Sequence, residues 1–399
     1  MSLNLTNLKK RISNAVETHK EEIIRLAEEI FDHPEVGQQE FFASRLLTQA
    51  LAKYGFEVVY PLPELPTGFR ATLKCAGPGP RVALLAEYDA LPGLGHACGH
   101  NLIGAAAVGA GLALAAVKEE LKGEVLILGT PAEESNGGKV VLVEAGAFQG
   151  IDAALIFHPG DANIVEVSSL ALEALEFIFE GRAAHASSSP EEGINALEAL
   201  IQFFNSINSL RPYLKGEAHI NGIITEGGIT PNIIPERAVA RFYIRAESRK
   251  AVREVVQRVE NCARGAALAT GCSVTWRNYE FSYDAMVTNK ALADAFKENL
   301  RILGVTEFGP PRRSKGSLDM GNVSRVVPAI HPYLALGSGR LVPHTREFAR
   351  AARGEAGRRL VILAAKALAW TAADVLLDRE LLARIQEEFS LAMLQEGAF

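Results

Sequence analysis

The chain has 399 residues, of which 48% are apolar, and a formal net charge of −6 at pH 7. This length exceeds what a single hydrophobic core usually fills, so we expect two domains. The apolar content excludes a disordered chain. The acidic balance provides no positive surface for phosphates, so we expect no nucleic-acid partner.

The N-terminus and the cysteines indicate a compartment. The first six residues, MSLNLT, lack the apolar segment of a secretory signal. The longest apolar run, residues 102–117, is shorter than the roughly 20 residues that cross a bilayer. We therefore expect a cytoplasmic protein without a membrane partner, in which unpaired cysteines stay reduced. The four cysteines, which show no paired spacing, are Cys75, Cys98, Cys262 and Cys272.

The first part of the chain alternates predicted helices with predicted strands. Apolar spacing predicts a helix over 8–31 that stops before Pro34, and a second helix over 40–53 that ends at Gly55. Alternation of this kind indicates a mostly parallel sheet wound with helices on both faces. The further predicted elements are strands 56–60, 69–74 and 81–86, helix 101–120, strand 124–129, helix 139–144 and strand 153–157.

The pattern changes near Leu170 and returns to helices at 348–376 and 379–394. Between them, the order β-α-β-β-α-β is typical of a ferredoxin-like domain. We therefore expect an α/β catalytic domain split over residues 1–170 and 284–399, with a ferredoxin-like α+β lid domain inserted over 171–283. The predicted elements of the insertion are strand 172–180, helix 193–210, strands 218–226 and 237–245, helix 250–269 and strand 273–279.

Side chains that bind metals follow three of the predicted strands. The carboxyl ends of strands in a wound sheet meet at one edge, so we expect these side chains to converge. Thiolate, imidazole and carboxylate groups together are ligands for a divalent transition metal, and we predict such a site. The candidates, in chain order, are Glu87, Asp89, Cys98, His100, Glu133, Glu134 and His158.

Each of these signals is weak alone, because paired glutamates are usually solvated and a single histidine at a strand end is usually structural. Glu133 and Glu134 are neighbours, and they cannot both point the same way from an extended segment. One can therefore bind an ion while the other faces a water molecule. His344 precedes Thr345, a suitable helix N-cap, and is a natural further ligand.

The motifs resemble the M20 metallopeptidase family, and more narrowly its amidohydrolase branch. The segments that carry the resemblance are residues 86–92 (AEYDALP), 95–101 (GHACGHN), 131–134 (PAEE) and 181–186 (GRAAHA). Within the branch, residues 317–324 and 327–332 look most like the group of peptidase M20 domain-containing protein 2, whose members are dipeptidases. The resemblance covers nearly the whole chain.

The resemblance implies two divalent ions, zinc or manganese with cobalt as a further option. It implies that Cys98 bridges them and that the remaining ligands are His100, Glu134, His158 and His344. It also implies Glu133 as the general base, Asp89 as the acid that orients a ligand, and His185 of the lid as a catalytic histidine, which in many members serves the partner subunit. Asn232 and Arg245 match substrate-binding residues. One departure is Asn101, where many members have aspartate.

The implied activity is hydrolysis of the amide bond of an N-acyl amino acid or a dipeptide-like substrate by a metal-activated water molecule, in a homodimer or higher homo-oligomer. Two alternatives stay open. A binding or regulatory protein could retain the metal without hydrolysing anything, but the acid Glu133 beside Glu134 favours an enzyme. A hydrolase could use Cys98 as a nucleophile with His100, although their close spacing favours shared metal ligation.

Overall fold

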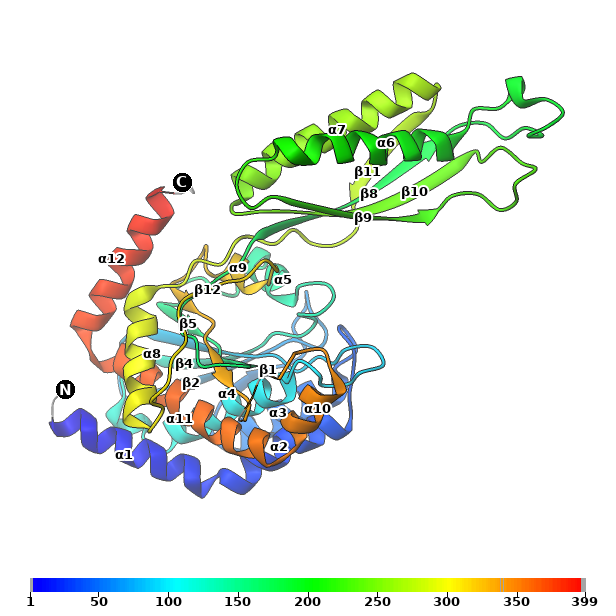
Figure 1. Ribbon diagram of the computed structural model, residues 1–399. Coiled ribbons are helices and arrows are strands. Elements are labelled where there is room, and N and C mark those ends of the chain that lie inside the picture. The colour runs from blue at the N-terminus through cyan, green and yellow to red at the C-terminus, as the bar shows by residue number, and fades with distance from the viewer. Residues whose placement is uncertain (1–2, 338, 340, 396–399) are drawn as a thin grey trace. The chain divides into compact units, whose positions relative to one another are not determined.

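The continuously apolar run at 81–86 forms strand β3 (Arg81–Ala86), which lies inside a six-stranded sheet (Figure 1). The computed structural model describes residues 3–337, 339 and 341–395. The strand order is β1-β2-β4-β3-β5-β13. The pairings from β4 to β13 are parallel, whereas β1 and β2 join in antiparallel pairs, so the sheet is mostly parallel, as predicted. Its other strands are β1 (Glu57–Val59), β2 (Phe69–Lys74), β4 (Glu124–Gly129), β5 (Ala153–Leu155) and β13 (Ala329–Ile330).

Helix α4 (His100–Ala115) packs against β3 on one side and against helices α2 and α11 on others, and its residues from 100 to 114 are all buried. Small residues allow this close packing. Helix α11 (Glu355–Leu377) is long and apolar enough to cross a membrane by length and composition, but 83% of its most apolar window is buried inside the protein. This burial is typical of a core helix of a folded domain.

Two long helices of the sequence prediction are interrupted. The predicted helix 8–31 is in fact α1 (Leu3–Thr18) and α2 (Lys20–Asp32), with a turn at His19, whose ring packs edge-on against Tyr54. The predicted helix 348–376 is α10 (Arg346–Arg353) followed by α11, because Gly354 adopts an extended backbone. Apolar periodicity continued through both breaks, so it could not reveal them.

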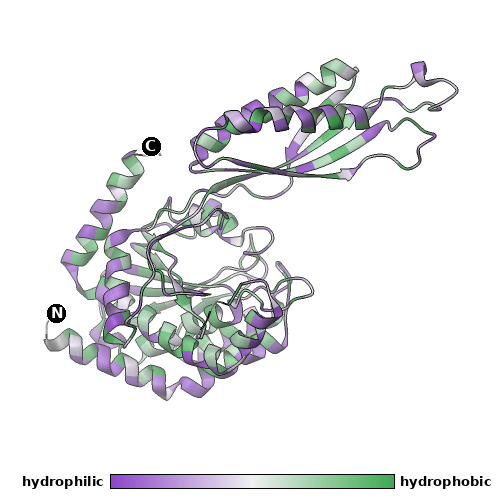
Figure 2. Ribbon diagram, viewed as in Figure 1, coloured by the Kyte–Doolittle hydropathy of each residue, from purple (hydrophilic) through white to green (hydrophobic). Residues whose placement is uncertain are grey.

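The inserted segment forms a separate four-stranded antiparallel sheet with the order β11-β8-β10-β9, which is the ferredoxin-like arrangement predicted from the sequence. Helices α6 and α7 pack on this sheet around a core that includes Phe177, Phe203 and Phe242. Both helices alternate hydrophilic and hydrophobic residues (Figure 2). The elements are β8 (Ala171–Glu180), α6 (Ala196–Leu210), β9 (His219–Glu226), β10 (Arg237–Ala246), α7 (Arg249–Thr270) and β11 (Ser273–Asn278).

The chain divides into two compact units. The first unit consists of Met1–Ser168, Met286–Ser314 and Asp319–Phe399, and the second of Ser169–Ala285 and Lys315–Leu318. The sequence placed the insertion at 171–283. It gave no indication that the short segment from 315 to 318 belongs with the second unit, where the Leu170 N–H donates to the Gly316 carbonyl.

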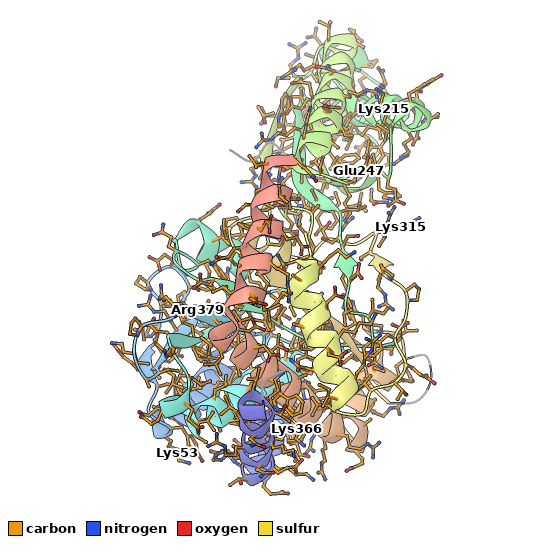
Figure 3. All side chains as sticks on the ribbon, turned by 90° about the vertical axis from the view of Figure 1, so that its left-hand side faces the viewer. Lys53, Lys215, Glu247, Lys315, Lys366 and Arg379 are labelled. Atoms are coloured by element: carbon orange, nitrogen blue, oxygen red, sulfur yellow. The ribbon has the colours of Figure 1, made fainter. Side chains whose placement is uncertain are left out.

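Shorter elements and terminal helices complete the first unit. Helix α12 (Arg379–Gln395) lies beside α8 (Lys290–Ile302), and Lys366 of α11 pairs with Glu17 of α1 (Figure 3). The remaining elements of this unit are α3 (Phe41–Lys53), α5 (Gly138–Glu144), α9 (Met320–Val323), β6 (His158–Gly160), β7 (Val167–Ser168), β12 (Arg312–Arg313), β14 (Tyr333–Ala335) and the 3-10 turn Lys118–Glu120, which replaces the end of predicted helix 101–120. The second unit adds 3-10 turns at Pro190–Glu192 and Arg211–Tyr213.

Candidate metal centre

A tight turn before α4 places the thiol of Cys98 and the imidazole of His100 in one buried site. Gly99 between them has φ +82°, a conformation that side chains other than glycine rarely adopt. A Cβ atom added at Gly99 would lie 2.9 Å from Cγ of Pro159. The turn therefore needs glycine both for its backbone and for its close approach to the neighbouring strand β6.

His100 is oriented by Asp89, which follows β3. Its Nδ1 lies 2.9 Å from Oδ1 of Asp89, and the other carboxylate oxygen, Oδ2, accepts the Glu134 N–H at 2.9 Å. Nε2 of His100 is buried and has no hydrogen-bond partner among the residues that the structure describes. A carboxylate on one ring nitrogen directs the other nitrogen toward a metal, as in many metalloproteins.

All five expected ligands lie together in the first unit. Ligand atoms of Cys98, His100 and His158 lie within 4.8 Å of one another, and those of Cys98, Glu134 and His344 form a second such group. The two groups share the Cys98 sulfur. A third group joins Glu133 and Glu134 with His100, so the expected general base faces the same site.

Local contacts hold the two terminal histidines. Nε2 of His158 lies 3.4 Å from Sγ of Cys98, and its Nδ1 lies 2.7 Å from the Pro159 carbonyl oxygen. Nε2 of His344 lies 3.2 Å from Oε1 of Glu134. His344 has φ +63°, which is uncommon for a residue other than glycine, and its N–H donates to the Ala97 carbonyl at 2.9 Å.

The electrostatics of the cluster suit cations. Burial lowers the pKa of His158 to about 3, so the ring is neutral and able to donate a lone pair. Burial would raise the pKa of Glu134, but the hydrogen bond from His344 and the charge of His100 lower it to about 2. Burial raises the pKa of the Cys98 thiol, so a thiolate here needs a compensating positive charge.

The donor set fits two divalent ions. Sulfur, imidazole nitrogen and carboxylate oxygen are ligands of zinc and related metals. Ligand atoms of one tetrahedral zinc ion lie roughly 3.3–3.8 Å apart, which is close to the separations of Cys98 from His158 and of Glu134 from His344. Nε2 of His100, which has no hydrogen-bond partner among the described residues, is a further donor, and two groups that share one sulfur suit two ions.

The other three expected residues belong to the second unit. His185 and Asn232 lie on adjacent segments, since the Ala186 N–H donates to the Asn232 carbonyl at 3.0 Å. Arg245 is on β10, where its guanidinium lies 4.9 Å from the centre of the Tyr243 ring. Its Nε is buried and finds no hydrogen-bond partner in the described part of the chain. Within this unit Arg245 lies far from His185, because the two flank opposite ends of the β8–β10 pairing.

Several buried polar residues beside the cluster have no role in the site that the resemblance implies. Asn101, the departure from the branch pattern, donates through Nδ2 to the Ala27 carbonyl at 3.0 Å, so it ties α4 to α2 rather than orienting a ligand. Glu87 was a candidate from the sequence without an assigned role; it lies two residues before Asp89 and so points the same way from an extended segment. The further residues are Lys139, Asp319 and His331, all buried.

Comparison with known proteins identifies the class. Residues 83–367 match the model of Peptidase family M20/M25/M40. The chain is 39% identical to the human Xaa-Arg dipeptidase over 98% of this chain and 93% of that protein. It is 34% identical to one of the polypeptides of the Escherichia coli p-aminobenzoyl-glutamate hydrolase, over 74% of this chain and 66% of that one.

The chain therefore belongs to peptidase family M20/M25/M40 and is a hydrolase of this family. A solved structure agrees in fold. A dinuclear metal-binding peptidase of the M20 family from Bacillus subtilis superimposes with a TM-score of 0.68 at 23% identity, covering 90% of this chain and 99% of that one.

Proposed function

We propose that the protein hydrolyses the amide bond of dipeptides or N-acyl amino acids with the help of two divalent metal ions. The observation that carries this proposal is the pair of donor groups that share Cys98, with the carboxyl group of Glu133 beside them. The names of the relatives, a dipeptidase and an aminobenzoyl-glutamate hydrolase, support the substrate class. Family membership gives no support to the non-enzymatic alternative.

Divalent ions, when bound, lower the pKa of water and polarise a carbonyl group. Zinc is the proposed metal because a thiolate is a soft ligand. Glu133 would take the proton of the attacking water and later give it to the leaving amine. Burial, followed by the charges of Glu87, Glu134 and Asp319, raises the pKa of Glu133 well above its usual range, which makes it a stronger base.

His185 suits the stabilisation of a developing oxyanion. Its Nδ1 accepts hydrogen bonds from the N–H groups of Ser187 at 3.2 Å and Ser188 at 3.1 Å. A ring whose Nδ1 accepts carries its proton on Nε2, so Nε2 is left as a donor. A donor of this kind is worth about 2.7–4 kcal/mol in an acyl-transfer transition state.

Arg245 suits a substrate carboxylate, because its buried Nε has no partner within the described residues. However, it cannot share a substrate with His185 of the same unit. Arg237 and Arg245 pair with opposite ends of β8, and eight strand residues span roughly 26 Å. The loop of His185 projects beyond the Arg237 end (Figure 1). A dipeptide spans only about 7 Å.

We therefore propose a homodimer in which His185 serves the metal site of the partner copy. A mixture of the variants Glu133→Gln and His185→Ala tests this arrangement. If the histidine acts across the dimer, a 1:1 mixture regains about a quarter of wild-type turnover after subunit exchange, because half of the dimers are mixed and one of the two sites in each is intact. Turnover that stays at the level of the separate variants after subunit exchange would place His185 in its own chain's site.

The central test is Glu133→Gln assayed with dipeptides that include C-terminal arginine. Without the base, turnover should fall about 10²–10⁴-fold, while the protein still binds two metal ions by elemental analysis. Unchanged turnover would contradict the assigned role. Activity that resists chelation and is blocked by a thiol alkylator would instead identify Cys98 as the nucleophile. Comparing zinc with manganese and cobalt identifies the metal.

A further inference from the structure

Lys139, at the start of α5, is a fully buried lysine held between two buried carboxylates. Its Nζ lies 2.5 Å from Oε1 of Glu87 and 2.7 Å from Oδ1 of Asp319, and its own N–H donates to Oδ2 of Asp319 at 3.0 Å. All three side chains are at most 1% exposed. Desolvation opposes a buried charge, so such a triad persists only where its groups compensate one another.

The triad has two carboxylates, Glu87 and Asp319, but only one cation, Lys139. The Glu87 carboxylate faces the metal cluster. Lys139 pairs with Oε1 of Glu87. Oε2 is buried, has no hydrogen-bond partner within residues 3–337, 339 and 341–395, and lies 3.5 Å from Nε2 of His100. Asp89 occupies the other nitrogen of the same ring. The two carboxylates that follow β3 therefore flank His100, one on each ring nitrogen.

Glu87 would lie close to an ion held by His100, because its Oε2 is 3.5 Å from Nε2 of that residue. Among the described residues, the groups of donors that lie within 4.8 Å of one another place His100 with Cys98 and His158, or with Glu133 and Glu134. Glu87 belongs to none of these groups. Its charge nevertheless acts on any cation held by Nε2 of His100, because the low polarity of a buried site strengthens Coulomb attraction.

We propose that Glu87 is an additional, non-coordinating carboxylate that raises the affinity of the His100 side of the site for a divalent cation. Lys139 is the positioning residue that holds it there, and Asp319 fixes Lys139. The proposal rests on the metal site of the proposed function. It adds three residues to that site, drawn from the end of β3, from α5 and from the segment before α9.

The first variant is Glu87→Gln, which keeps the size and the contact with Lys139 but removes the charge. We expect zinc and cobalt affinity, measured by competition with a chromophoric chelator, to fall about 10–100-fold for one of the two ions, as for other residues outside the ligand set. The visible spectrum of the cobalt form should keep the band positions of the wild type. Glu87→Asp, which retains the charge, should recover part of the affinity.

The second variant is Lys139→Met, with Lys9→Met as the matched control. Lys9 is also a buried lysine, but its hydrogen bonds go to Asn299 and Asp374. We expect Lys139→Met to lower the affinity for the same ion. The double variant with Glu87→Gln should bind that ion no more weakly than Glu87→Gln alone. The control should bind both ions as the wild type does. If Lys139→Met does not fold, the Glu87 variants alone decide the proposal.

The outcomes separate this inference from the proposed function. Wild-type protein that fails to bind two ions would contradict the metal site itself. Wild-type binding of two ions together with unchanged affinity in Glu87→Gln would overturn only the role of Glu87. Shifted cobalt bands in Glu87→Gln would make it a ligand and overturn the non-coordinating role. If the fold-losses in affinity of the two single variants multiply in the double variant, Lys139 does not act through Glu87.

Discussion

At the residue scale, unusual backbone conformations gather around the donor cluster. Among the described residues other than glycine, positive φ occurs at Gln38, Ala132 and His344. Ala132 precedes the proposed base, and His344 is a proposed ligand. Each such conformation costs on the order of 1–3 kcal/mol and persists only where neighbouring contacts hold it. For Ala132 that contact is the hydrogen bond from its N–H to Oε1 of Glu40 at 2.8 Å.

Glu40 makes stability depend on pH. Burial, and then the charge of Asp89, raise its pKa to about 7, from an ordinary value of 4.5. The folded chain thus holds a proton that the unfolded chain releases at lower pH. The stability that the protonated carboxyl contributes is complete below pH 4.5 and is lost as the pH rises through 7. The loss amounts to about 3 kcal/mol.

The prediction is that Glu40→Gln removes this dependence. Urea unfolding at pH 5 and pH 8 should give a difference in unfolding free energy between the two pH values that is about 3 kcal/mol smaller in the variant than in the wild type. Comparing differences cancels the contributions of other groups. Parallel pH profiles for the two proteins would show that Glu40 is ionised in the folded state throughout this range.

What the sequence could predict also differs by residue. The expected ligands could be named individually because short motifs carry them at the ends of strands. Lys139 and Asp319 could not, because their ion pair joins positions 180 residues apart, and a lysine in an apolar helix is no signal by itself. The sequence could not predict the hydrogen-bond partner of Asn101 either, because a side-chain amide can donate to any nearby carbonyl.

At the scale of elements, periodicity predicted where most helices and strands lie but not where they are interrupted. β3 and β4 match their predicted ranges because Pro80 or Gly123 precedes each strand and a polar residue, Glu87 or Thr130, follows it. The turn at His19 and the extended Gly354 divide helices whose apolar spacing runs on. Such breaks depend on packing partners, as with the ring of Tyr54 against His19, and a local pattern contains no information about these.

At the scale of the whole molecule, the second unit is an almost continuous insertion into the first. Every proposed metal ligand belongs to the first unit, whereas His185, Asn232 and Arg245 belong to the second. The ends of the insertion are close together, because Oγ1 of Thr288 donates to the Val167 carbonyl at 2.6 Å. The chain thus separates ion binding from the proposed contacts to substrate, and the division can be tested by removing the insertion.

Replacing residues 169–285 with a short glycine–serine linker should leave a first unit that folds and binds two ions, because its sheet and all five ligands remain and the linker closes a short gap. Turnover should fall at least as far as in His185→Ala, because every proposed substrate contact outside the metal site is gone. Elemental analysis and a dipeptide assay measure the two properties on one preparation. A folded first unit that no longer binds metal would mean that the second unit helps to assemble the metal site, and full turnover would exclude His185, Asn232 and Arg245 from the reaction.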